Sequence, residues 1–443
     1  MGLFYEVSDR NVLLVAGAVR YYNLELFAQS VAKLELELKR KIEVIFLNDT
    51  KNQIVSADQL KKVPRSKLVT CNLGSLVSLE NAILPYNDKL LAVLCTREDD
   101  IPIFKKVIPH VPYLLTPNAE SLDWTTNKVQ MRRRLVTYDP KLTPVYSVAE
   151  DATQETIDRI IKKVGFPLVV KPAGLAASLL VSVCYDEEEF KTALTKALAA
   201  ISKVYKQYGG RGEPQILVEQ FLEGTMYSID AYVTARGRVY TCPPVHVKTG
   251  RAIGIDDFHG YQQLTPVKLQ KPKVEEAEAV AKDAVLAMGL RNVTCHVEMI
   301  KTESKGWKVI EIAARPGGFR DILYNLAYGI DHIHNDILIR LPKRPKISRK
   351  AKGYAVAMKF FPREEGKLIK VSGLEKLKKF ESFHKLMVNK KDGDICMHSK
   401  HGGKSVFDVI MFNQTRAKLI ADIRRLERLV TIQTEPLNGN KKN

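Results

Sequence analysis

The sequence lacks several signatures that would narrow its class at once. It holds six cysteines in 443 residues, none in a Cys-x-x-Cys pair, so neither a zinc site nor a disulfide framework is indicated. Reduced, buried thiols are expected, as in a cytoplasmic protein. The turn after the first apolar segment reads Gly17-Ala18-Val19-Arg20 instead of Gly-x-Gly-x-x-Gly, which does not support a dinucleotide site. No Ser-His-Asp or Cys-His constellation indicates covalent catalysis.

Long apolar runs are also missing. The run Val12–Val19 near the start is far too short to cross a bilayer. Glu6, Ser8 and Asp9 stand where a signal peptide would carry basic residues, and Glu6 also breaks the myristoylation pattern. We therefore expect no leader and no membrane partner.

The sequence is rich in positive charge. Lys and Arg number 69 against 50 Asp and Glu, a formal net charge of +19, which favours anionic partners such as nucleotides, acidic substrates or nucleic acid. Basic clusters stand at 132–134, 343–352 and 376–379. Because no aromatic residues are interleaved with them in a nucleic-acid module, we interpret these clusters as solvated surface and do not favour a nucleic-acid partner.

Length and pattern predict an α/β multidomain protein. A hydrophobic content of 45% is that of a globular protein, and the length corresponds to about three domains. Apolar strands alternate with helices over residues 1–124, which predicts a Rossmann-like domain with an open parallel sheet and a boundary segment at 114–126. We expect a second domain over 125–345, a small β-rich domain over 346–434 and a disordered tail over 435–443.

The stretch 295–320 holds the strongest chemical signal. Two apolar runs, each carrying one acid (Glu298 and Glu311), flank a polar turn and predict a β-hairpin. Cross-strand neighbours on one face lie about 5 Å apart, and two acids so placed among apolar residues need a cation between them. Mg²⁺ suits such carboxylates beside phosphates, and the nearby Arg315 and Arg320 suit phosphoryl transfer. A surface hairpin with an incidental ion pair is the alternative interpretation.

Three further segments suit a nucleotide. Asn127 and its neighbours offer N-caps for a helix that opens with Lys128. Lys171 ends a buried strand and is followed by a loop of small residues, 173–178, whose backbone N–H groups can approach phosphates closely. A plain tight turn would look the same. The polar segment that opens with Lys248 has few apolar anchors and is typical of an active-site loop.

At this point the sequence resembles the ATP-grasp superfamily, and in motif most closely the L-amino-acid ligase-like carboxylate–amine ligases. The resemblance covers roughly 128–341 and rests on ordered landmarks: Thr-Asn-Lys128, Pro-Leu-Val-Val-Lys171-Pro, Val-Glu219-Gln-Phe-Leu-Glu-Gly, His-Val-Glu298 and Glu311-Ile-Ala-Ala-Arg315. It implies a pre-ATP-grasp domain, a two-part ATP-grasp domain and a small C-terminal domain.

The resemblance also implies roles for individual residues. Expected ATP contacts are Lys128, Lys171, Ser178, the hinge residues Glu219, Gln220, Phe221 and Leu222, and, for the ribose, Asp230. Glu298 and Glu311 would hold Mg²⁺, with Mn²⁺ as an alternative. Arg315 would steady the transferred phosphoryl group, and Lys248, Arg320 and His296 would face the acceptor substrate. For His296 an ordinary inward strand position is equally supported.

The sequence departs from the family pattern at two positions. Ala313 stands where many members have an Asn two residues after the second metal acid, which leaves open whether one or two Mg²⁺ ions bind. Met226 stands where a ribose-binding acid is common, so Asp230 is the substitute we expect.

The expected function is an ATP-dependent carboxylate–amine ligase that forms an amide through an acyl phosphate and releases ADP and phosphate. Its expected partners are a small carboxylate and an amine. Alternatives are an ATP-grasp carboxylase or nucleotide-pathway enzyme with a phosphorylated substrate, and a catalytically silent ATP-binding protein. The oligomeric state stays open, with a homodimer as one arrangement.

Overall fold

The computed structural model describes residues 9–51, 55–175, 179–255 and 257–437, and these form four sheets. The first is parallel, as predicted, in the order β3-β2-β1-β4. Its strands are β1 (Val12–Val15), β2 (Glu43–Asp49), β3 (Ser66–Cys71) and β4 (Leu90–Leu94). Its helices are α1 (Leu24–Leu38), α2 (Ala57–Lys62), α3 (Leu76–Ile83) and α4 (Ile101–Val107), with short 3₁₀ turns η1 to η4 at 21–23, 84–86, 98–100 and 108–110.

Two helices connect this unit to the next sheet. The predicted boundary segment 114–126 instead contains helix α5 (Ala119–Thr126), because the Asn118 side chain caps it by accepting from the Glu120 N–H. Helix α6 (Lys128–Tyr138) begins as predicted, with Asn127 accepting from the N–H groups of Val129 and Gln130. Lys128 is thereby fixed at the first position of a helix.

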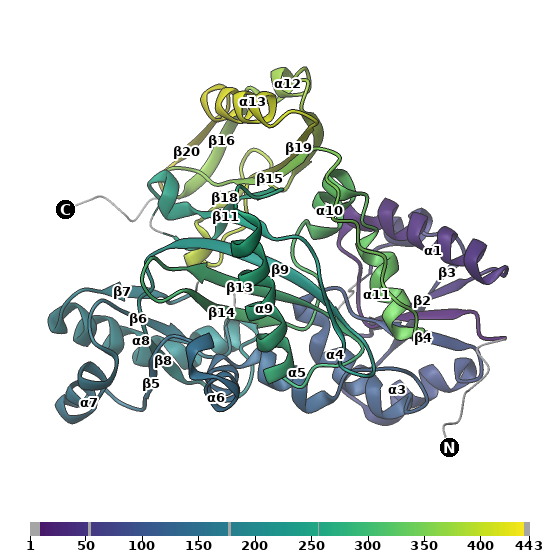
Figure 1. Cartoon of the computed structure of the whole chain (residues 1–443), viewed down its shortest axis with the longest axis horizontal. Helices are drawn as coiled ribbons and strands as arrows, with labels where there is room; N and C mark the ends of the chain where they lie inside the picture. Colours follow the sequence, from purple (N-terminus) through teal and green to yellow (C-terminus); the bar gives the residue numbers. More distant parts are fainter. Residues whose placement is uncertain (1–8, 52–54, 176–178, 256, 438–443) are drawn as a thin grey trace.

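The second sheet forms a small lobe at the left of Figure 1. Its antiparallel order is β5-β8-β6-β7. The strands are β5 (Tyr146–Ala149), β6 (Leu168–Pro172), β7 (Ser182–Cys184) and β8 (Ile216–Gln220), covered by α7 (Gln154–Val164) and α8 (Glu187–Tyr208) and preceded by η5 (Pro140–Leu142). One side of α7 and α8 packs on the sheet in a single apolar cluster.

The third sheet is the largest and runs through the middle of the molecule. Its order is β14-β13-β9-β11-β12-β15-β19-β17, with β10 paired to β9. The strands are β9 (Thr225–Val233), β10 (Val239–Thr241), β11 (Val245–Thr249), β12 (Gly260–Thr265), β13 (Val293–Lys301), β14 (Trp307–Ala313), β15 (Tyr354–Phe360), β17 (Phe383–Val388) and β19 (Phe407–Asn413). Helices α9 (Lys271–Ala287), α10 (Arg320–Tyr328) and α11 (His332–Arg340) pack beside it, and η6 (Gly250–Ile253) follows β11.

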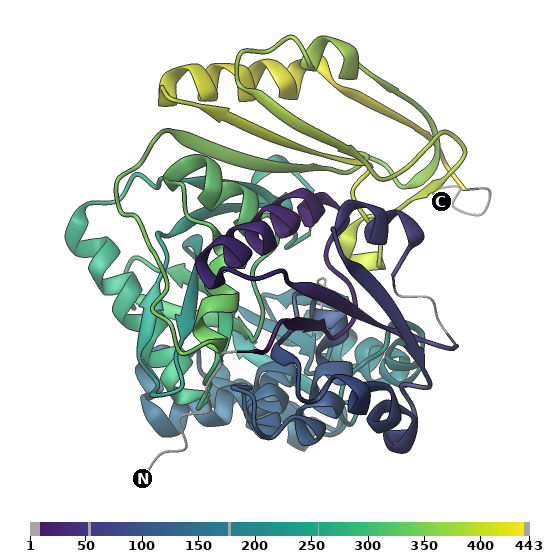
Figure 2. The same cartoon turned by 90° about the vertical axis from the view of Figure 1, so that its right-hand side faces the viewer.

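The fourth sheet completes a C-terminal layer, which lies across the top of both views (Figures 1 and 2). It contains β16 (Gly366–Ser372), β18 (Ile395–Cys396) and β20 (Thr431–Glu435), with α12 (Leu374–Leu377), α13 (Arg416–Leu429) and η7 (Ser399–His401). Strands β15, β17 and β19 of this region extend the central sheet, so the sheet continues across the predicted boundary at 345/346. Glu435 belongs to β20, and residues 438–443 of the predicted tail lie outside the described residues.

The hydrophobic core also joins the predicted domains. One cluster combines Leu14 and Val93 of the first sheet with Ala284 of α9 and Val297 of the central sheet. A second combines α1 with Ile337 of α11. All six cysteines are described, buried and free, as expected. Among the described helices, none has the length and apolar character needed to cross a membrane.

Candidate active site

A cavity of about 570 Å³ lies between the small lobe and the central sheet, a volume typical of small-molecule sites. Its walls combine β6 and β8 of the lobe with β11, β13 and β14 of the central sheet. Of the expected site residues, it brings together Lys128, Lys171, Glu219, Gln220, Phe221, Leu222, Lys248, Glu298 and Glu311. Segments that span most of the expected nucleotide-binding domain therefore meet in one cavity.

The two acids of the hairpin are direct cross-strand partners. Glu298 on β13 pairs with Glu311 on β14, and a β-bulge follows Glu298. Both line the cavity. Oε1 of Glu311 lies 3.2 Å from the Lys128 ammonium, and Oε1 of Glu298 lies 3.3 Å from Nε2 of His296. Two like charges at this register are thus each balanced by one neighbouring cationic or polar group.

This donor set fits Mg²⁺. Burial by itself would raise the pKa of Glu298, but the hydrogen bond and charge of His296, and then Arg315 and Arg320, hold that pKa below its usual value. Glu298 is therefore a carboxylate ready to bind a cation. The described residues contain no cluster of three or more His, Cys, Asp or Glu suited to a metal. Two carboxylates suit a Mg²⁺ ion that shares its remaining ligands with water and phosphate.

Lys171 is held by a buried ion triad. Its ammonium lies 2.6 Å from Oε2 of Glu219, and the Arg132 guanidinium donates to both oxygens of Glu219 at 2.6 and 3.3 Å. Arg132 also donates to the Ile310 carbonyl of β14. Burial would raise the pKa of Glu219, but Arg132 and Lys171 lower it to about 2. Both carboxylate oxygens of Glu219 are thus engaged within the triad: Oε1 binds Arg132, and Oε2 binds Arg132 and Lys171.

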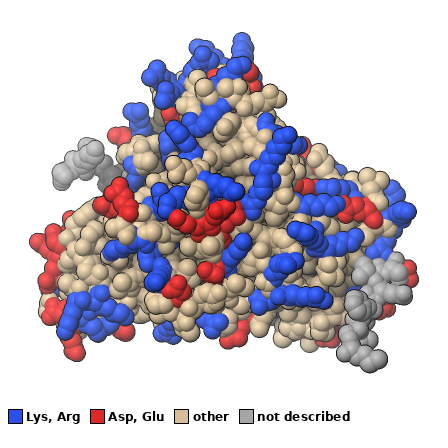
Figure 3. Space-filling model, viewed as in Figure 1, with Lys and Arg blue, Asp and Glu red and all other residues tan. Residues whose placement is uncertain are grey.

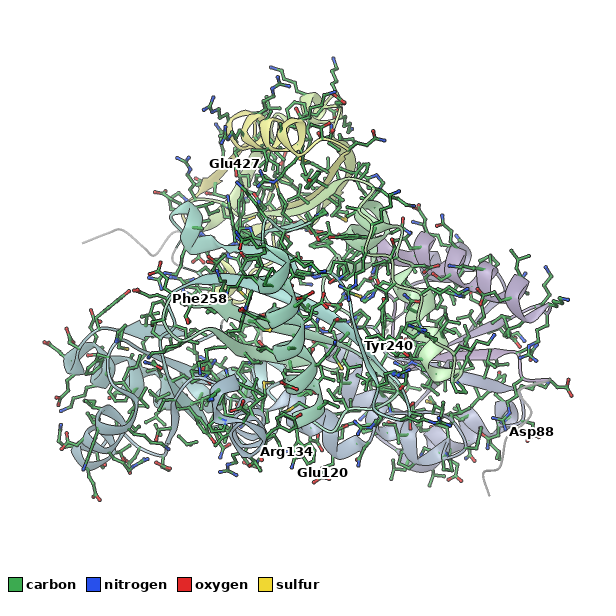
Figure 4. The ribbon with its side chains drawn as sticks, in the orientation of Figure 1. Asp88, Glu120, Arg134, Tyr240, Phe258 and Glu427 are labelled. Atoms are coloured by element: carbon green, nitrogen blue, oxygen red, sulfur yellow. The ribbon has the colours of Figure 1, made fainter. Side chains whose placement is uncertain are left out.

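The triad corrects one sequence interpretation. Arg132 belongs to a cluster that we interpreted as solvated surface, yet its side chain is 0% exposed. Arg134, labelled in Figure 4, stacks on Trp124 at 4.1 Å and donates to the Ala287 carbonyl. Only Arg133 is exposed as expected. The spacing contained a signal that we missed, because Lys128 and Arg132 lie four residues apart and share one helix face.

The hinge residues Glu219, Gln220, Phe221 and Leu222 all line the cavity. The N–H of Gln220 donates to Val145 and that of Phe221 to Pro167, so neither is available to a ligand. Leu222 and Met226 line the same wall. Arg251 also lines the cavity and lies 5.5 Å from the Phe221 ring and 5.3 Å from the Phe258 ring.

The polar segment from Lys248 also borders the cavity as predicted. Lys248, Thr249, Arg251, Ala252 and Phe258 contribute to its wall. Figure 4 shows Phe258 at the junction of the central sheet and the small lobe. The apolar and cationic groups of this wall suit a flat aromatic ring that carries phosphates.

The structure does not bring Asp230 to the cavity. Asp230 is 0% exposed, accepts from the Gly317 N–H, and contacts His296 at 2.6 Å and His332 at 2.9 Å. Despite burial, these histidines hold its pKa well below the usual value. Asp230 shares a face of β9 with Met226, which lines the cavity, but it lies four residues further along the strand, so the cavity wall does not include it for the expected ribose contact. Glu223 lines the cavity instead and was not singled out from the sequence.

Two other expected residues have different surroundings. Arg320 is buried and donates to Gln263 and Ser228. Arg315 donates through Nε to Glu98 at 2.8 Å and interacts electrostatically with Glu298 and Glu311. Neither arginine is among the side chains that line the cavity. Ser178 lies outside the described residues.

This geometry defines a nucleotide-and-cation site in an α/β protein with two lobes. Residues 164–321 match the family model described as an ATP-grasp domain. This match agrees with the resemblance that the sequence motifs indicated. The match contains both acids, Lys171 and the hinge.

The chain is also similar to a curated relative and to solved structures. An uncharacterized protein of Sinorhizobium fredii is 26% identical over 59% of this chain and 51% of its own length, so the chain spans about half of that relative. An L-amino acid ligase from Bacillus licheniformis has a TM-score of 0.73 at 17% identity, covering 96% of this chain and 99% of that one. An N5-carboxyaminoimidazole ribonucleotide synthetase from Thermotoga maritima has a TM-score of 0.65 at 15% identity, covering 96% and 100%. At these identities the two structures establish the fold.

Proposed function

We propose that this chain is an ATP-dependent carboxylate–amine ligase. The observation that carries the proposal is the in-register pair Glu298–Glu311 in a cavity that also holds Lys128 and Lys171. A triphosphate places a high negative charge beside a divalent cation, and this set offers two cation ligands and two ammonium groups. The likeness to an L-amino acid ligase over nearly the whole chain supports this class of reaction.

The proposed reaction has two steps. A substrate carboxylate oxygen attacks the γ-phosphorus of ATP, the bond to the bridging oxygen breaks, and ADP leaves. The nitrogen of the amine then attacks the acyl carbon of the acyl phosphate, inorganic phosphate leaves, and the nitrogen releases one proton. No side-chain nucleophile takes part.

In this reaction the residues of the chain bind the nucleotide and neutralise the negative charge of its phosphates. Lys171, fixed by Glu219 and Arg132, and Lys128, beside Glu311, would contact phosphate oxygens. Mg²⁺ held by Glu298 and Glu311 would offset charge on the transferred phosphoryl group. Arg315, near both acids, would stabilise the same group in the transition state. The wall with Phe221 and Leu222 would hold adenine.

The test is a screen of carboxylates and amines for Mg²⁺-dependent ADP release, with mass detection of the condensed product. An amide product that forms only with ATP and Mg²⁺ is the expected result. The likeness to the Thermotoga maritima synthetase favours a second candidate, a ligase for a phosphorylated acceptor. Stronger ADP release with phosphorylated acceptors than with amino acids would select that candidate. ATP binding without turnover in any mixture would contradict both.

A further inference from the structure

Glu98 joins three parts of the molecule that the sequence separates widely. It lies in η3, directly after β4 of the first sheet. Its Oε1 lies 2.6 Å from the Arg211 guanidinium and its Oε2 lies 2.8 Å from Nε of Arg315. Arg211 also donates to the Glu98 backbone carbonyl at 2.5 Å. One carboxylate therefore bridges an arginine of the small lobe and the arginine next to the two metal-binding acids.

We propose that Glu98 is a positioning residue that sets the orientation of Arg315 and at the same time holds the small lobe against the first domain. The inference rests on the proposed function, because it assigns Glu98 a role in ATP turnover. Glu98 itself contacts neither the cavity nor the two acids in the described structure, so it acts through the two arginines.

The first part of the argument is the orientation of Arg315. Nε donates to Glu98, and Nη1 donates to the Pro316 carbonyl at 3.0 Å. Within the described residues, Nη2 of Arg315 has no hydrogen-bond partner. A planar guanidinium fixed at two of its nitrogens has little rotational freedom, so Nη2 keeps one direction and is left to bind a substrate oxygen. Arg315 follows the last residue of β14 by two positions and Glu311 by four, and the charges of Glu311 and Glu298 act on its guanidinium.

The second part is the connection to the phosphate end of the small lobe. The Arg211 N–H donates to the Gly174 carbonyl at 3.0 Å. A Cβ at Gly174 would lie 2.0 Å from the Arg211 carbonyl oxygen, so the two backbones are in close contact. Next to Gly174, the Leu175 carbonyl accepts from the Lys128 ammonium, which also contacts Glu311. We call the contacts of Glu98 with Arg211 and Arg315 the clasp. Through Arg211 the clasp is connected to the loop and the lysine that are expected to hold phosphates.

The third part is the strength of the clasp. The side chains of Glu98, Arg211 and Arg315 are 20%, 21% and 18% exposed, so water screens their charges only in part. Burial would raise the pKa of Glu98, but Arg315 and then Arg211 lower it, so the carboxylate is charged at neutral pH. Charge-assisted hydrogen bonds of this kind are short and strong. If the lobe opened, Arg211 would leave Glu98, and one of the two restraints on this carboxylate would be lost.

The experiment compares Glu98→Gln, Arg211→Met and the control Asp99→Asn. Asp99 is the neighbouring acid, 81% exposed, with one weak contact to Arg97 at 3.5 Å. Steady-state ADP release gives kcat and the KM for ATP. Hydrogen–deuterium exchange of the peptide that contains Gly174 reports on the lobe contact without turnover.

Glu98→Gln is expected to lower kcat about 100-fold, because a small misplacement of a group that binds the transition state has this effect, and to increase exchange at Gly174. Arg211→Met is expected to increase exchange and raise the KM for ATP, with a much smaller loss of kcat. Asp99→Asn should match the wild type in both measurements.

A kcat for Glu98→Gln within twofold of the wild type would overturn the proposal. An equal loss of kcat in Arg211→Met would also overturn it, because Glu98 would then act only by holding the small lobe. Unchanged hydrogen–deuterium exchange at Gly174 in both variants would overturn it as well. Failure of the proposed function is a separate result: the wild type itself would then release no ADP in the presence of Mg²⁺.

Discussion

Glu298 and Glu311 face each other across β13 and β14 as paired residues of one antiparallel ladder, and both carboxylates border the same cavity. Their substitution gives the most direct test of the site. Glu311→Gln and Glu298→Gln keep shape and remove one charge each. We expect each to lower Mg²⁺-dependent ADP release about 100-fold or more, because a cation ligand at the phosphoryl group is lost.

The matched control is Glu303→Gln, in the exposed turn of the same hairpin. Circular dichroism and thermal melting should show that all three variants are folded. ADP release at the wild-type rate from Glu311→Gln would contradict the assignment of Glu311 as a Mg²⁺ ligand.

Arg132→Met tests the buried triad. The substitution leaves Glu219 without its bidentate partner in an environment from which water is excluded. Removing one partner of a buried ion pair costs about 3–5 kcal/mol of unfolding free energy, which urea denaturation can measure. Arg133→Met is the control, since Arg133 is exposed on the same helix, and it should change stability by less than about 0.5 kcal/mol. Equal effects of the two would show that Arg132 is not held as described.

The same triad predicts a pH dependence. The pKa of Glu219 is lowered from 4.5 to about 2 in the folded state, so its contribution to stability is complete above 4.5 and is lost as the pH falls towards 2. Glu219→Gln removes this contribution at every pH. The difference in unfolding free energy between wild type and Glu219→Gln should therefore shrink as the pH is lowered from about 5 to about 2.5. A constant difference over this range would contradict the assignment.

Gly174→Ala tests the close contact between the loop and Arg211. The added Cβ would meet the Arg211 carbonyl oxygen at 2.0 Å, and this atom is backbone and cannot rotate away. We expect a loss of about 1–3 kcal/mol in stability, as for overpacked interiors, together with weaker ATP binding by calorimetry. Gly318→Ala is the control, because a Cβ there would meet nothing within 4 Å. A fully stable Gly174→Ala protein would show that the two segments separate easily.

Charge on the molecular surface is distributed broadly. Figure 3 shows Lys and Arg side chains over much of this face, including its top, on the layer with α12 and α13. The cluster at 376–379 belongs there, and Lys378 pairs with Glu375 at 3.0 Å. The interpretation of the cluster at 376–379 as solvated surface therefore agrees with the structure. The same interpretation is wrong for Arg132 in the cluster at 132–134.

The sequence predicted those parts of the site whose pattern lies within a single short segment. The hairpin with Glu298 and Glu311 has alternation, a turn and a short loop, so its register follows from local pattern. The cap at Asn127 and the strand that ends at Lys171 are local in the same sense. Asp230 was not placed correctly because alternation gives the face of β9, which Asp230 shares with Met226, but not how far along the strand the cavity extends.

The sequence alone determined the hairpin with its acid pair, the helix that begins at Lys128 and the parallel first sheet, since turn chemistry and the period of apolar residues act over a few neighbours. Only the tertiary structure decided that Arg132 is buried against Glu219 and that Glu98 binds both Arg211 and Arg315. These contacts join residues that are 87 to 217 positions apart. They depend on how lobes and sheets pack, and no local pattern records which buried charges will meet there.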